Sequence, residues 1–91
     1  MRRNGLSRRE DSILDVLQQR VGADYMSDLR LPQYRRAALR ELLRLPAEAY
    51  PEALWCDAVL YLTEGMKMPG TREQAMREAK EMLEWLHAND K

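Results

Sequence analysis

An apolar stripe with helical spacing recurs in four segments of this chain, and each segment begins or ends at proline, glycine or a capping residue. Pro32 suits a first helical turn, where its missing N–H costs nothing. Pro46 ends the same segment, because a residue before proline avoids the α conformation. No run of alternating β-branched residues indicates a strand. We predict an all-α, single-domain bundle of four main helices at about 8–21, 32–45, 51–64 and 72–88, with either a short helical turn or an irregular connector at 23–30.

Polar and glycine residues mark the ends of these helices. Two capping boxes, one running from Ser7 to Glu10 and one from Thr71 to Gln74, predict helix starts, because each side chain satisfies a backbone N–H of the other. Gly22 and Gly65 predict helix ends. The 51–64 helix is apolar over most of its circumference, so we expect it to lie at the centre of the fold.

The chain has 91 residues, enough for one domain with one modest core. We divide it into a flexible basic arm at 1–6 and a helical domain at 7–91. The apolar share of 45% and the charged share of 33% are typical of a globular protein rather than a disordered one.

Charge is balanced overall but unevenly distributed. Residues 1–45 carry ten Arg or Lys and six Asp or Glu, a net charge of +4; residues 46–91 carry five and nine, a net charge of −4. The two halves can pair within one chain or between two copies. The single cysteine excludes an internal disulfide, and the N-terminus lacks a hydrophobic signal core, so we expect a cytoplasmic protein.

Candidate catalytic and metal-binding groups are sparse. Nucleophilic catalysis needs a nucleophile, a base and an orienting group. The only histidine, His87, lies near the end of the last predicted helix, and the only cysteine, Cys56, lies in the most apolar one. Acidic pairs such as Asp11 and Asp15 follow no EF-hand or Glu-x-x-His spacing. We therefore expect no enzymatic activity, no cofactor and no metal site.

Arg36, Arg40 and Arg44 recur every four residues along one edge of the second predicted helix, and we call them the arginine row. No acidic residue within that helix is four positions from any of them, and like charges at this spacing repel by a few tenths of a kcal/mol per pair. We expect an acidic surface opposite the row. It would come from Asp57 and Glu64 of the same chain, or from a partner.

A nucleic-acid phosphate backbone is one such partner, since several arginines together can grip it. The candidate contacts are Arg2, Arg3, Arg8, Arg9, Gln33, Arg36, Arg40 and Arg44. The helix offers only Gln33 for reading bases, and the total charge is neutral. We keep this function, an accessory protein of the kind that small bacterial or phage operons encode, as the alternative hypothesis.

Two apolar residues lie off the main faces of their helices, Trp85 in the last helix and Leu60 in the third. Tryptophan is enriched at the energetic centres of protein interfaces. Alternatively, the arm or the 23–30 connector covers Trp85. Our first hypothesis is a non-enzymatic protein-interaction module, an adaptor, regulator or inhibitor that binds another protein or forms a homodimer. Its candidate contacts are Trp85, Leu60, Arg36, Arg40 and Arg44.

Overall fold

The structure, a computed structural model, describes residues 13–88, and these contain helices and turns but no strand. The elements follow in the order α2 (Ile13–Val21), η1 (Met26–Arg30), α3 (Pro32–Leu42), η2 (Ala47–Ala49), α4 (Glu52–Leu62) and α5 (Arg72–Ala88), where η1 and η2 are 3-10 helices. The predicted all-α bundle of four main helices is confirmed. The first turn predicted at 8–12 and the arm at 1–6 lie outside the described residues.

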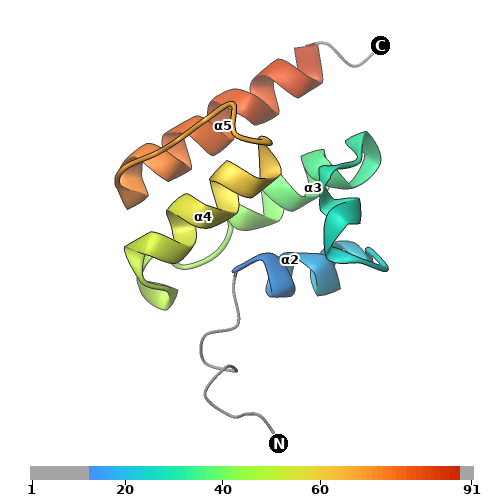
Figure 1. Cartoon of the computed structure of the whole chain (residues 1–91), viewed down its shortest axis with the longest axis horizontal. Helices are drawn as coiled ribbons and strands as arrows, with labels where there is room; N and C mark the ends of the chain where they lie inside the picture. The colour runs from blue at the N-terminus through green and yellow to red at the C-terminus, as the bar shows by residue number, and fades with distance from the viewer. Residues whose placement is uncertain (1–12, 89–91) are drawn as a thin grey trace, which may run out of the picture.

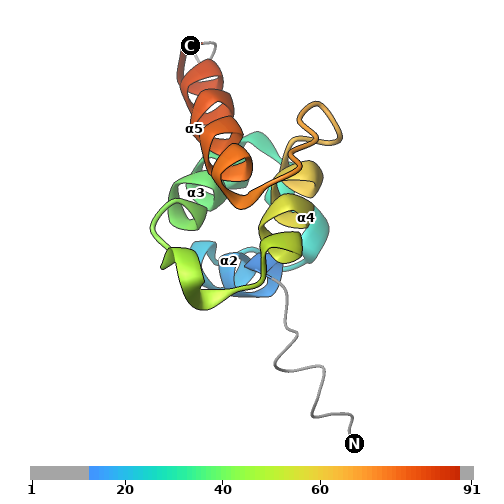
Figure 2. The ribbon, with the colours of Figure 1, turned by 90° about the vertical axis from the view of Figure 1, so that its left-hand side faces the viewer.

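The helices α3 and α4 form the middle of the bundle (Figure 1). Helix α5 packs on both of them from one side, while α2 and η1 pack from the other (Figure 2). Each helix turns its apolar stripe toward the centre, as helical periodicity requires. The largest fully buried side chains are Trp55, Ile13, Leu17, Leu29, Leu39, Leu42, Leu62, Val59 and Thr63.

Helix α3 is shorter than predicted, because it ends at Leu42 rather than at Leu45. The next turn tightens: the Arg44 N–H donates to the Glu41 carbonyl at 3.0 Å, and the Leu45 N–H donates to the Leu42 carbonyl at 3.2 Å. Such i to i−3 bonds are common in the last turn of a helix. They turn the Leu45 side chain into the core, where it is 5% exposed.

Gly22 ends α2 as predicted. Its φ of +77° lies in the left-handed region that favours glycine. The N–H groups of Gly22 and Ala23 both donate to the Gln18 carbonyl, at 3.0 and 3.1 Å. The connector that follows contains a helical turn, η1, with Leu29 buried, whereas Tyr25 is 71% exposed and does not face inward.

Helix α5 has the predicted bounds and a modified cap. The Gln74 N–H donates to Thr71 Oγ1 at 3.1 Å, as a capping box requires. The Gln74 side chain accepts from the Gly70 N–H at 2.8 Å instead of from Thr71, so the reciprocal bond is displaced by one residue.

Helix α4 is less enclosed than its composition suggests. Trp55 is fully buried; its Nε1–H donates to the Tyr50 carbonyl at 3.2 Å, and its ring meets the Tyr50 ring edge-on at 6.2 Å. On the opposite side Asp57 and Leu60 are exposed. The helix predicted at 51–64 therefore lies at the centre of the fold together with α3, but it is not buried all round, because α4 keeps one open face.

Candidate interaction surfaces

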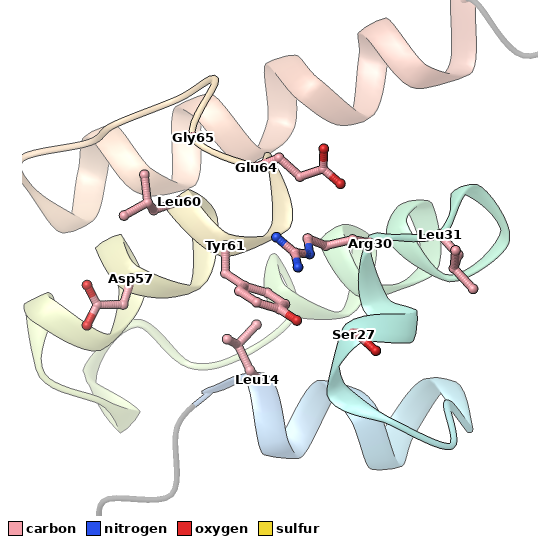
Figure 3. A pocket seen from close by; sticks show the side chains of 9 residues that line it. All are labelled: Leu14, Ser27, Arg30, Leu31, Asp57, Leu60, Tyr61, Glu64 and Gly65. Carbon is pink, nitrogen blue, oxygen red and sulfur yellow. The ribbon is translucent and has the colours of Figure 1, made fainter.

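An open groove of about 790 Å³ lies between η1 and α4, and we call it the η1–α4 groove. Figure 3 shows the side chains that line it, from α2, η1, α4 and the turn that follows α4. They are Leu14, Ser27, Arg30, Leu31, Asp57, Leu60, Tyr61, Glu64 and Gly65.

Four large side chains give this groove an apolar lining. Leu14 and Tyr61 are half-buried against the core, while Leu31 and Leu60 are 43% and 38% exposed. The sequence placed Leu60 off the main face of its helix, and the structure agrees. Leu31 carried no sequence signal, since it lies in a connection whose direction depends on how η1 meets α3.

Charged groups lie at both ends of the η1–α4 groove. The Arg30 guanidinium lies 4.4 Å from the centroid of the Tyr61 ring, in cation–π geometry, on the side where Glu64 lies (Figure 3). Glu64 Oε2 accepts from Arg35 at 2.9 Å. Asp57 is exposed and makes no ion pair with any residue in 13–88. Among residues 13–88, the groove therefore offers the carboxylate of Asp57, which has no ion pair, and that of Glu64, which Arg35 already binds.

Glu64 has an unusual backbone conformation at the edge of this groove. Its φ is +54°, in the left-handed region that costs a residue with a side chain roughly 1–2 kcal/mol. The Glu64 N–H donates to the Tyr61 carbonyl at 3.1 Å, and the Gly65 N–H donates to the Leu60 carbonyl at 2.9 Å. These bonds satisfy the last carbonyls of α4 and fix the turn.

A second apolar surface lies where the loop after α4 passes the C-terminal half of α5. Met66, Met82 and Trp85 line a depression of about 350 Å³, with Lys67 and Glu81 beside them. We call these three apolar residues the methionine–tryptophan patch. Met66 and Trp85 are 64% and 53% exposed, and the nearby Met68 is 75% exposed. Lys67 Nζ lies 3.4 Å from Glu81 Oε1, which ties the loop to α5.

Trp85 and Leu60, the two apolar residues that the sequence selected, thus belong to different surfaces. Trp85 lies in the methionine–tryptophan patch and Leu60 in the η1–α4 groove. From the sequence, Met66 and Met68 were more simply explained as core fillers than as a binding surface, whereas both are exposed. A loop has no face until its neighbours are known. The 23–30 connector does not line the patch.

The arginine row does not face Asp57 and Glu64. Glu64 binds Arg35, which directly precedes the row, and Asp57 lies in the groove. The acidic partner of Arg44 is Glu41, which lies in the last turn of α3, at 3.5 Å. That i, i+3 spacing was visible in the sequence.

Glu41 also binds Arg20 of α2, at 3.2 Å, so one carboxylate serves two guanidinium groups. Arg40 is exposed beside α5, in a shallow depression with Leu83 and His87, and Gln33 is exposed as well. Arg36 is half-buried. The remaining candidate nucleic-acid contacts, Arg2, Arg3, Arg8 and Arg9, lie outside the described residues.

The lone cysteine, Cys56, is free and half-buried in α4. Burial raises the pKa of the Cys56 thiol above its usual value, and the nearby carboxylates of Glu52, Asp57 and Glu78 raise it further. The thiolate is the nucleophile, so a raised pKa disfavours reaction at neutral pH. His87 lies in the depression near Arg40, which Cys56 does not line.

No group of three or more His, Cys, Asp or Glu side chains within 13–88 is placed to hold a metal ion. Among the helices of that region, none combines the length and apolar character that crossing a membrane demands.

Comparison with known proteins gives no relative: no protein family, no curated protein and no solved structure matches this chain. Its surfaces are therefore interpreted from their residues alone.

Proposed function

We propose that this protein is a non-enzymatic protein-interaction module of the cytoplasm, an adaptor, regulator or inhibitor, with self-association as its simplest form. The observation that supports the proposal best is the methionine–tryptophan patch. Two of its three side chains, Met66 and Trp85, are each more than half exposed, although they come from a loop and from α5 and line one depression. Exposed apolar side chains that gather in one place are typical of a binding site.

The composition of the patch suits a protein partner. Methionine is unbranched and adapts its shape to different apolar surfaces. Tryptophan buries a large area and is enriched among residues whose truncation weakens binding most. Lys67 and Glu81, which flank the patch, give it a charged rim of both signs. Such a rim suits an apolar contact with polar edges.

Sedimentation velocity over a micromolar concentration range tests the homodimer form. We expect the wild-type sedimentation coefficient to rise with concentration and the Trp85→Ala variant to stay monomeric. Tyr25→Ala is the matched control, since Tyr25 is also a large aromatic residue, 71% exposed, but lies outside the patch. A strict monomer would exclude the homodimer.

A different protein partner is tested by photo-crosslinking in the native host, from a probe at position 85 and from a control probe at position 25. The proposal expects a discrete product from position 85 that position 25 does not give. Identical products from both positions would contradict an interaction module that acts through this patch.

Nucleic-acid binding is the second candidate, supported by two exposed arginines, Arg40 in α3 and Arg44 in the turn that follows it. Binding through several arginines weakens steeply with salt. A mobility shift of duplex DNA or single-stranded RNA is therefore sought at about 50 mM salt, where phosphate contacts are strong. Arg40→Glu should abolish it, and Arg77→Glu on the exposed face of α5 is the control. No shift at low salt ends this hypothesis.

A further inference from the structure

We infer that the η1–α4 groove is the docking site of the chain's own N-terminal segment, residues 1–12. This inference is independent of the proposed function, because the groove and the methionine–tryptophan patch share no lining residue. Three observations support it: the place where the described chain begins, the charges of the groove, and its exposed leucines.

The described chain begins beside the groove. The described chain begins at Ile13, and the next residue, Leu14, lines the groove. Leu6 precedes Leu14 by eight residues, which span at most about 26–29 Å when extended. That reach is sufficient for Leu6 to meet any side chain of the groove to which Leu14 belongs.

The charges of the two partners are complementary. Residues 1–12 carry four arginines and two acidic residues, a net charge of +2. The groove presents Asp57, which has no ion pair with any residue in 13–88, and Glu64, whose side chain is 53% exposed although it binds Arg35. Its one basic residue, Arg30, is engaged with the Tyr61 ring. An arginine of the segment therefore meets carboxylates that still have room for another donor.

Apolar contacts complete the match. Leu6 is the only large apolar residue between Met1 and Ile13. Leu31 and Leu60 each leave more than a third of their surface to solvent on the groove. Figure 3 shows these two leucines at opposite ends of the groove, and contact of Leu6 with either of them removes apolar area from water on both partners.

Tethering makes even a weak contact effective. A segment joined to its site by a short linker is present there at an effective concentration on the order of millimolar. A contact whose dissociation constant is in that range is then about half populated. Because exposed ion pairs contribute, the docked fraction falls as salt screens them.

Paramagnetic relaxation in the full chain tests the inference. A spin label is placed at Arg3→Cys in a Cys56→Ala background, and the methyl signals of Leu31 and Leu60 are observed. We expect them to lose more than half of their intensity at about 50 mM salt and to recover at about 500 mM. A label at Glu48→Cys on η2 is the matched control.

Three results would overturn the inference. The first is that the methyl signals of Leu31 and Leu60 keep their intensity. The second is that all exposed methyl groups lose intensity equally. The third comes from a sample that mixes isotope-labelled chains with separate spin-labelled chains. If the signals of Leu31 and Leu60 broaden as much in this mixed sample as in the spin-labelled chain itself, a second copy supplies the segment.

A second measurement avoids any change near the core. In the wild-type background, Leu6→Ala should shift the signals of Leu31, Leu60 and Tyr61 and leave those of α5 unchanged. Asp57→Arg should produce the same shifts as Leu6→Ala, because both release the segment. If neither variant moves these signals, the segment does not dock. Trp85→Ala should leave the groove signals as they are, so that this inference and the proposed function fail separately.

Discussion

The left-handed backbone of Glu64 gives the most direct test of the structure. We compare Glu64→Gly with Glu64→Ala, since both remove the ion pair with Arg35 and only one keeps a Cβ atom. A residue with a Cβ atom at φ +54° pays roughly 1–2 kcal/mol of steric energy. Glycine avoids this term but raises the conformational entropy of the unfolded chain, which offsets about 0.4–1 kcal/mol. The glycine variant should therefore be more stable than the alanine variant by about 0.5–1 kcal/mol.

Urea denaturation followed by circular dichroism measures this difference, which corresponds to about 2–8 °C in Tm for a domain of this size. The difference in stability between the wild type and Glu64→Ala measures the contribution of the Arg35–Glu64 ion pair. Arg35 is 15% exposed and Glu64 53%, so screening by solvent limits the pair to about 0.5–1 kcal/mol. We therefore expect the glycine variant to fall close to the wild type and the alanine variant below both. An alanine variant as stable as the glycine variant would mean that residue 64 is not left-handed, and the described turn after α4 would be wrong.

Three further predictions concern other positions. Gly22→Ala should lower the free energy of unfolding by about 1 kcal/mol in urea titration, because φ is +77° and no atom lies within 4 Å of the added Cβ, so strain alone acts. Thr63→Val should cost about 1 kcal/mol by the same assay and speed amide exchange at Lys67, whose N–H donates to Thr63 Oγ1 at 3.2 Å. Cys56 should react with iodoacetamide only at higher pH than free cysteine, since its pKa is raised. Its protonated form stabilises the fold below the unfolded pKa of about 8.5, and this contribution is lost as pH rises through the higher folded pKa. Cys56→Ala should therefore flatten the pH dependence of stability above pH 8.5, while a wild-type thiol alkylated as fast as glutathione at pH 7.5 would refute the raised pKa.

Helix type and position followed from local chemistry. The apolar stripe of α5, with Ala75, Ala79 and Met82 buried, was readable from spacing alone, and so was the glycine that ends α2. These features depend on neighbours within one turn of the chain. The ends of α3 and α4 were less predictable, because competing i to i−3 bonds and the left-handed Glu64 decide them.

The candidate surfaces were harder to predict than the helices. Periodicity showed that Leu60 and Trp85 lie off their helix faces, but it could not show that they belong to different surfaces. Methionine content alone suggested either an adaptable binding surface or core filling, and it could not show that Met66 and Met68 are exposed. Ion pairs divide in the same way. The Arg44–Glu41 pair joins residues three positions apart, a spacing that the sequence displays, whereas the Arg35–Glu64 pair joins residues 29 positions apart.

The sequence by itself determined that this chain forms four amphipathic helices, since side chains three and four residues apart share a face of any helix. Only the tertiary structure decided which exposed residues meet, because the η1–α4 groove and the methionine–tryptophan patch each join segments whose separation in space depends on how the helices pack. Interaction surfaces are made by that packing.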